Sequence, residues 1–165
     1  MKKGLQIRFA RKSDLVEIVR LCAEHSEFEL ASYDPAGKEE KLAAALFCRI
    51  PSLNCLLAEF DGEAVGFATF MKQFSTWNAQ NYLYIDCLYV CESQRCNGIG
   101  EKLIRRIIDR SRKLECDRIE WQTPSFNTRA MKFYRRIGAA SKSKMRFFLD
   151  ISAATEEENK NDRSF

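Results

Sequence analysis

The sequence predicts one α/β domain, built on a mixed, mostly antiparallel central sheet with helices on both faces. Three observations support this fold. A chain of 165 residues suits a single domain. Segments with the apolar pattern of strands are interleaved with segments of helical period. Hydrophobic residues make up 45% of the chain, which excludes disorder for most of it. We expect the domain to span residues 1–151, followed by a disordered polar tail at 152–165.

The N-terminal part is expected to form a strand and two helices. Residues 5–9 alternate apolar and polar side chains, as in a strand with one exposed face. An amphipathic helix runs from about residue 13 to 28, beginning at a Ser-Asp pair. Residues 34–37 (Asp-Pro-Ala-Gly) have the chemistry of a turn, and a short helix covers residues 39–47.

Three strands are expected in the middle of the chain. Residues 54–60 and 64–70 are apolar runs joined by Asp61-Gly62, a strong hairpin signal. The run 82–90 is long and aromatic, which is typical of a strand buried on both faces. Asp86 is the one carboxylate inside that run.

The C-terminal part is expected to add two helices and two strands. The helical period begins after Gly98 and gives a long helix with one apolar and one basic side. Residues 118–122 form a strand. Residues 127–137 form a helix that ends at Gly138, a typical C-cap residue. Residues 143–151 form the last strand.

Charge and cysteine content exclude several classes of protein. The formal net charge of +4 suits a small anionic ligand better than DNA, so no nucleic-acid partner is expected. No apolar run is long enough to span a bilayer and no secretory signal is recognisable, which favours a cytoplasmic protein without a membrane partner. The seven cysteines are odd in number and lack CxxC spacing, and there is one histidine, so we expect reduced thiols and no metal.

The loop Arg95–Gly100 carries the most informative pattern. It connects a buried strand to the start of a helix, where free N–H groups and a partial positive charge favour an anion. Gly98 and Gly100 let a ligand approach the backbone, and Arg95 suits phosphate oxygens. The loop lacks the Lys-Ser/Thr pair of a P-loop and the GxGxxG fingerprint. These residues alone allow a phosphate site or a turn that only starts a helix.

The same loop carries a family resemblance. Arg95-Cys96-Asn97-Gly98-Ile99-Gly100, with Gln94 before it, matches the Arg/Gln-x-x-Gly-x-Gly/Ala signature of the GNAT superfamily of acetyl-CoA-dependent N-acetyltransferases. The chain resembles this superfamily over about residues 5–151. The resemblance implies a GNAT fold, in which the fourth and fifth strands splay apart.

Three stretches resemble the diamine branch of that superfamily, which acetylates spermidine, spermine and thialysine. They are Glu27-Phe28-Glu29, the Trp77 loop leading to Tyr84-Ile85-Asp86, and residues 127–134. The branch is commonly homodimeric, and the apolar residues of segment 144–151 predict a dimer that uses the last strands.

The resemblance implies a set of residues that bind acetyl-CoA as co-substrate. A first group offers backbone atoms to the pantetheine arm, a second wraps the pyrophosphate, and a third lines the other side. They are Leu88, Tyr89, Val90; Gln94, Arg95, Cys96, Asn97, Gly98, Ile99, Gly100, Glu101; and Asn127, Arg129, Ala130. Cys96 departs from the family, because many relatives have glycine at this position.

The chemistry of amine acetylation assigns roles to three further groups. An alkylamine has a pKa of about 10.4 and must lose a proton before it attacks. Asp86 would attract the cationic amine and relay that proton, and the Leu88 N–H would polarise the thioester carbonyl. The resemblance makes Tyr134 the proton donor to the leaving thiolate. The structural alternatives are an Asp86 paired with arginine and a Tyr134 packed in the core.

The acceptor is expected to contact Glu27, Phe28, Trp77 and Gln122. Glu29 lies beside Glu27, and both would attract a cation if they face the cleft; solvation at the surface is the alternative. Trp77 would offer a cation–π face, or simply pack. His25 is expected on the helix surface.

The sequence therefore predicts an N-acetyltransferase that acts on a primary amine of a small cationic acceptor, such as a polyamine, a diamine or an amino-acid-like molecule. Transfer would occur by direct attack in a ternary complex. Two alternatives stay open at this point. One is acetylation of a protein lysine or N-terminus, and the other is a non-catalytic sensor that binds acyl-CoA.

Overall fold

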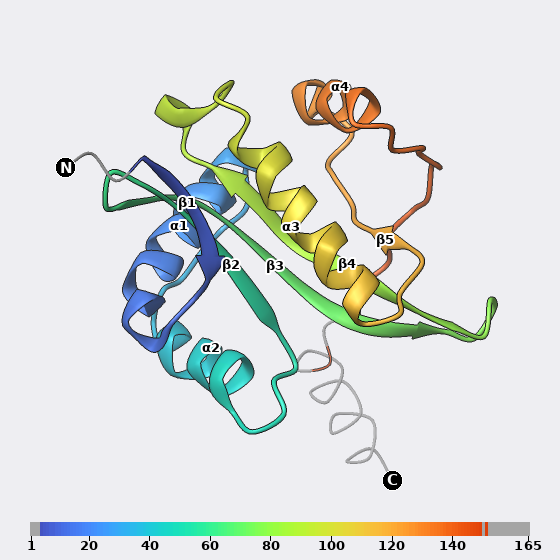
Figure 1. The fold of residues 1–165 in the computed structure, drawn as a ribbon, viewed down its shortest axis with the longest axis horizontal. Coiled ribbons are helices and arrows are strands. Elements are labelled where there is room, and N and C mark those ends of the chain that lie inside the picture. Colours follow the sequence, from blue (N-terminus) through green and yellow to red (C-terminus); the bar gives the residue numbers. More distant parts are fainter. Residues whose placement is uncertain (1–3, 150, 152–165) are drawn as a thin grey trace, which may run out of the picture. The chain divides into compact units, whose positions relative to one another are not determined.

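The computed structural model describes residues 4–149 and 151, and these contain one five-stranded sheet of order β1-β2-β3-β4-β5 (Figure 1). The strands are β1 (Leu5–Phe9), β2 (Asn54–Phe60), β3 (Glu63–Ser75), β4 (Gln80–Val90) and β5 (Ile119–Glu120). The first four pair antiparallel, and β4 pairs with β5 in parallel. The predicted mixed, mostly antiparallel sheet is confirmed.

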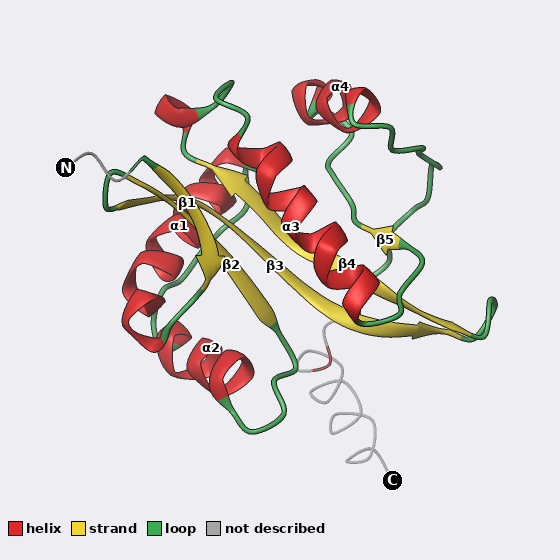
Figure 2. Cartoon of the chain, viewed as in Figure 1, coloured by secondary structure: helices red, strands yellow, loops and turns green. Residues whose placement is uncertain are grey.

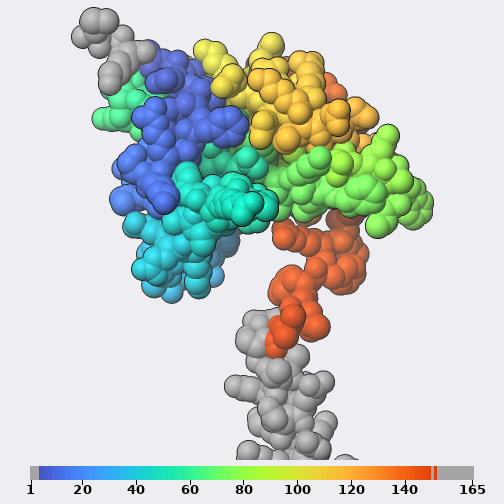
Figure 3. All heavy atoms as spheres, turned by 60° about the horizontal axis from the view of Figure 1, so that its bottom comes forward, coloured from blue at the N-terminus to red at the C-terminus, as the bar shows by residue number. Residues whose placement is uncertain are grey.

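Helices cover both faces of this sheet, as predicted (Figure 2). The helical segments are η1 (Lys12–Asp14), α1 (Leu15–Phe28), α2 (Lys38–Phe47), η2 (Glu92–Gln94), α3 (Ile99–Lys113) and α4 (Thr128–Arg136). On one face, α1 and α2 pack over Leu57 and Phe67, and they lie next to each other at the surface (Figure 3). On the other face, α3 buries Leu103 and Ile107 against the sheet. None of these helices is long and apolar enough to cross a membrane.

The hairpin between β2 and β3 has the turn predicted from Asp61-Gly62. Both residues have positive φ, +51° and +97°, and this pair of left-handed conformations matches the twist of the two strands. The hairpin between β3 and β4 is longer than predicted. Beyond Phe70, β3 has no partner in β2, and its last five residues pair only with the start of β4.

A β-bulge interrupts the pairing of β3 with β4. Phe70 lies opposite Ile85 and Thr69 lies opposite Cys87, so Asp86 is an extra residue in β4. Its side chain is exposed. The prediction of a strand buried on both faces is therefore wrong at Asp86, because the bulge removes this residue from the regular alternation of inward and outward side chains.

The fourth and fifth strands separate as the resemblance implies. Only Leu83 and Tyr84 of β4 pair with β5, while β4 continues to Val90. The strand predicted at 118–122 is shortened to two residues, because after Glu120 the chain no longer follows β4.

The chain divides between Met131 and Lys132 into two compact units. In the second unit, the strand predicted at 143–151 is wrong: residues 139–149 have no helix or strand assignment. The apolar side chains there, among them Phe147 and Phe148, are 85% and 92% exposed. An isolated strand has no partner for its backbone groups, so an apolar run alone does not produce one. The predicted tail at 152–165 lies outside the described residues.

Candidate active site

The last third of β4 presents an open backbone edge. The Cys87 N–H donates to Thr69 Oγ1 (3.1 Å) and the Cys91 N–H donates to the Val65 carbonyl (2.9 Å). The backbone N–H groups of both residues therefore point toward β3. Successive residues of a strand point their backbone groups to opposite sides. Leu88 and Val90 therefore direct theirs away from β3, where β5 no longer pairs with β4. The predicted position of the Leu88 N–H beside a thioester is geometrically available.

Gly66 fixes how closely β3 approaches this part of β4. A Cβ atom at Gly66 would lie 2.7 Å from the Tyr89 carbonyl oxygen and 3.3 Å from the Val90 Cα. Both contacts are with backbone, which cannot move aside cheaply. Only glycine therefore permits the observed spacing of the two strands next to the open edge.

The loop after β4 leads into α3 at the predicted glycine. Gly98 is the N-cap residue with φ of +73°, and the space that a Cβ would occupy there is empty to 4 Å. The Lys102 N–H bonds to the Gly98 carbonyl (3.0 Å), and Ile99 is buried in the core. The start of α3 is thus open where a Cβ of residue 98 would lie, and the free N–H groups of a helix start favour a phosphate. Cys96 also has a positive φ of +67°, so it keeps a backbone conformation that favours glycine.

Arg95 holds the loop in place. Its Nε donates to the Val90 carbonyl (2.9 Å), and its guanidinium lies over the rings of Phe28 (4.4 Å) and Tyr89 (5.6 Å). The side chain is 15% exposed. The sequence suggested a cation for phosphate oxygens. The structure shows that this guanidinium also fastens the loop to β4 and α1; its role toward phosphate stays a prediction.

The start of α4 supplies the other predicted co-substrate residues. Asn127 Oδ1 accepts from the Ala130 N–H (3.1 Å), so the Asn127 side chain caps the helix. Arg129 Nη2 lies 3.3 Å from Cys96 Sγ, which brings the first turn of α4 to the loop before α3. Of the remaining loop residues, Asn97 Nδ2 lies 3.5 Å from Gln94 Oε1, and Glu101 pairs with Arg105 at 2.7 Å.

On the other face, the bulge places Asp86 next to α1. Asp86 Oδ2 lies 3.7 Å from Cys87 Sγ. Its charge acts to raise the pKa of both Cys22 and His25 of α1, although burial lowers the pKa of His25 overall. For Cys22, burial is the larger cause, and together they raise the pKa to about 11. The carboxylate thus faces the end of α1 where the acceptor residues were predicted.

His25 packs against the sheet with its side chain 15% exposed, so its predicted place on the helix surface is wrong. It lies four residues after Leu21 and seven after Ile18, on the same apolar side of α1. Its ring stacks on Tyr89 (centroids 5.3 Å apart) and meets Phe67 edge-on at 6.3 Å. Burial lowers the pKa of His25, while the carboxylates of Glu29 and Asp86 oppose that change.

Glu29, and not Glu27, joins this group. Glu29 Oε1 lies 3.3 Å from His25 Nε2. Glu27 is exposed, because two residues along a helix are about 200° apart and it points away from the side of α1 that carries His25. Sequence analysis named both glutamates as candidate acceptor residues. The contact of Glu29 with His25 distinguishes it from the exposed Glu27.

The other predicted site residues differ in their surroundings. Phe28 contacts Arg95, whereas Trp77 is 95% exposed in the turn between β3 and β4, and Gln122 is exposed after β5.

The two tyrosines among the predicted site residues lie in different parts of the chain. The Tyr89 hydroxyl donates to Glu24 Oε2 (3.3 Å); burial and that carboxylate raise the pKa of Tyr89 to about 12. Tyr134 belongs to the second compact unit, where its ring lies 5.2 Å from that of Phe133.

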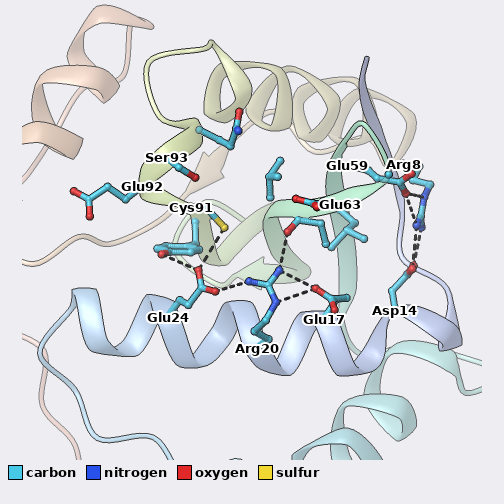
Figure 4. Close-up of a pocket in the computed structure, with 16 residues that line it drawn as sticks. Arg8, Asp14, Glu17, Arg20, Glu24, Glu59, Glu63, Cys91, Glu92 and Ser93 are labelled. Atoms are coloured by element: carbon cyan, nitrogen blue, oxygen red, sulfur yellow. Dashed lines mark hydrogen bonds and ion pairs between the residues drawn. The ribbon is translucent and has the colours of Figure 1, made fainter. Parts of the chain in front are cut away.

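Sequence analysis missed a charged hollow of about 760 Å³ beside α1 (Figure 4). In it, Arg8 bonds to Asp14 and Glu59, and Arg20 bonds to Glu17 and Glu24. Tyr89 and Gln94 are the predicted site residues among those that line it. Its two arginines pair with four of its carboxylates, and Arg20 also bonds to the Ala64 carbonyl; these bonds tie β1 to β2 and α1 to β3. The one sequence signal for this ion-pair network was the charged Arg8 in the alternating first strand.

An open sheet edge beside a glycine-bearing helix start, with carboxylates nearby, forms a candidate acyl-transfer site. The chain belongs to the acetyltransferase (GNAT) family, whose model matches residues 15–139. It is an N-acetyltransferase of this family, similar to the diamine branch.

Two relatives and one solved structure illustrate the similarity. Thialysine N-epsilon-acetyltransferase from Mus musculus is 32% identical over 142 residues, which cover 81% of this chain and 83% of the relative. The Bos taurus protein of the same name is 32% identical over 143 residues, covering 82% and 84%. The crystal structure of an aminoglycoside acetyltransferase from a soil metagenomic sample has a TM-score of 0.76 and 20% identity, covering 88% of this chain and 95% of that one. At that identity it supports the fold alone.

The strained loop gives a stability prediction. Replacing Cys96→Gly should stabilise the protein by about 1 kcal/mol, because the left-handed conformation no longer carries a Cβ penalty. Thermal unfolding would then shift upward by about 2–4 °C. The matched variant Gly98→Ala, at a similar φ, should shift it downward. Equal melting temperatures for Cys96→Gly and the unchanged protein would show that the loop is not strained at Cys96.

Proposed function

We propose that this N-acetyltransferase transfers the acetyl group of acetyl-CoA to a primary amine of a small cationic acceptor, in a ternary complex. The acceptor class is a polyamine, a diamine or an amino-acid-like molecule such as thialysine, the substrate named for the relatives above. The observation that carries the proposal is the bulge at Asp86. It leaves the Leu88 N–H on the open edge of β4 and places the Asp86 carboxylate near α1.

Acetylation of a protein lysine or N-terminus is the less supported alternative. That activity would suit a site whose carboxylates face away from the acceptor. Here Asp86 and Glu29 both act on the same imidazole, that of His25, so two negative charges gather in one place. A small molecule with a reacting amine at one end and a cation at the other matches such a pair of charges.

The proposed reaction forms one bond and breaks one. The neutral amine attacks the thioester carbonyl carbon, the new C–N bond forms and the C–S bond to coenzyme A breaks. Asp86 accepts the amine proton, directly or through water, and the Leu88 N–H stabilises the carbonyl oxygen as it gains charge. Tyr134, matched by family resemblance, protonates the departing thiolate. No described residue has to form a covalent intermediate.

A screen of amines tests the acceptor class. Thialysine, lysine, ornithine, simple alkyl diamines and a lysine-containing peptide are each incubated with acetyl-CoA, and released thiol is measured. We expect turnover with the small dications and little with the peptide. Preferred turnover of the peptide would replace the proposal with the protein-acetylation alternative.

The co-substrate site can be tested by binding alone. Acetyl-CoA should raise the melting temperature of the protein, because a ligand that binds only the folded state stabilises it. Gly100→Asp should abolish this shift, since it brings a side chain and a negative charge to the first turn of α3. The matched variant Asp109→Asn, on the same helix beyond its first two turns, should keep the shift. A folded protein whose melting temperature does not respond to saturating acetyl-CoA would contradict the proposal.

Tyr134→Phe tests the proton donor. The change removes one hydroxyl, so acetyl-CoA should still bind while kcat falls by about 100-fold, the low end of the usual effect of general acid catalysis, because a thiolate is already a fair leaving group. Asp86→Asn should raise the KM of the acceptor as well as lower kcat, since both attraction and proton transfer are lost. If Tyr134→Phe keeps full turnover when chemistry limits the rate, Tyr134 packs and does not donate.

We also propose that the protein is a cytoplasmic homodimer that uses its C-terminal segment. Met145, Phe147, Phe148 and Leu149 are each more than 80% exposed, an apolar run of the kind that a partner covers. Light scattering at micromolar concentration should give twice the chain mass of 19.1 kDa. Phe147→Ser with Leu149→Ser should restore the monomer mass, and a monomer before any substitution would reject the dimer.

A further inference from the structure

We propose that His25 is a positioning residue that holds Glu29 ready for the cationic end of the acceptor and makes acceptor binding depend on pH. This inference rests on the proposed function, because it concerns the same acceptor. It assigns a role to the chain's one histidine, which the reaction described above does not use.

The contacts of His25 leave its imidazole little freedom. Its side chain is 15% exposed, held between the ring of Tyr89 on β4 and that of Phe67 on β3. Nε2 lies 3.3 Å from Glu29 Oε1, in reach of a hydrogen bond that the imidazole donates. A glutamate at the end of a helix otherwise samples several rotamers, and fixing one of them lowers the entropic cost of binding a cation.

Among the described residues, the charged groups that act on His25 come from three places in the fold. Glu29 follows it at the end of α1, Asp86 faces it from β4, and Arg95 faces it from the loop before α3. β3 contributes only the uncharged Phe67. Burial is the largest influence and lowers the pKa of His25; Arg95 acts in the same direction, and the two carboxylates act against them. A lowered pKa favours the neutral imidazole at neutral pH, so that no positive charge on His25 competes with the acceptor beside Glu29 and Asp86.

Protonation of His25 weakens the attraction of this site for the acceptor's cation. An imidazolium beside Glu29 and Asp86 occupies the place of the acceptor's cation and offsets the charge that attracts it. By linkage, a bound cation must weaken proton binding at His25 by the same factor by which protonation weakens cation binding. Acceptor affinity should therefore be full above the pKa of His25 and fall as the pH drops through it.

A single histidine makes the direct test simple, because its imidazole signals in an NMR titration need no assignment. With coenzyme A bound, 1,4-diaminobutane should lower the proton affinity of His25 about tenfold, whereas butylamine, which lacks the second cation, should change it much less. Glu29→Gln should lower the pKa of His25, since the carboxylate raises it. Glu27→Gln is the matched control, on the opposite side of α1, and should leave the titration unchanged.

Kinetics of two His25 variants separate positioning from packing. His25→Gln keeps an N–H donor but does not titrate, so its KM for the diamine should match that of the unchanged protein at pH 8 and rise less at pH 6. His25→Leu keeps an apolar side chain and loses the donor, so KM should rise several-fold with kcat changed less. Circular dichroism establishes that each variant is folded, and the titration of the unchanged protein stands if one is not.

The outcomes distinguish this inference from the proposed function. If diamines are acetylated but leave the His25 titration and the pH dependence of KM unaltered, the role of His25 is overturned and the acetyltransferase proposal stands. If the amine screen finds no small acceptor, the proposed function fails by that result alone. A diamine that shifts the His25 titration supports the binding role in either case.

Discussion

The extra residue in β4 is the constraint on which both sides of the site depend. Without it, the alternation set by β3 would continue unchanged from Leu83 to Cys91, and Leu88 would direct its N–H toward β3. With it, the backbone of β4 changes sides once, at Asp86, and the same step turns a carboxylate toward α1. One local irregularity thus turns the Leu88 N–H to the open edge of β4 and the Asp86 side chain toward α1, the two groups to which the proposed function assigns roles.

The electrostatics around β4 depend on the contacts that each charged side chain makes. Arg95 has a long side chain that reaches back to Val90 and stacks on Phe28, so its charge stabilises the loop internally. Glu29 contacts His25, and Asp86 contacts Cys87. Backbone amides at the start of α3 and carboxylates where α1 ends give the two charge environments that the proposed anionic co-substrate and cationic acceptor require.

Sequence analysis predicted the elements from local signals, and it was least accurate where pairing is decided at a distance. The hairpin at Asp61-Gly62 and the start of α3 at Gly98 follow from backbone preferences of a few residues. The strand at 143–151 was inferred from an apolar run, but a strand also needs a partner, which no local pattern reveals. The bulge has no signature in the amino-acid sequence of either strand, so the exposure of Asp86 was not predicted. The position of His25, in contrast, follows from its helical spacing from Ile18 and Leu21.

The close approach at Gly66 has a consequence for how variation in this sheet should be interpreted. A methyl group there would meet the backbone of β4 before it met any side chain. A larger residue at this position would therefore push β3 and β4 apart. It would also change the direction of the backbone N–H groups on the nearby open edge of β4. An alanine at the matching position of a relative would imply a differently spaced sheet, even where every residue of the acyl-transfer site is the same.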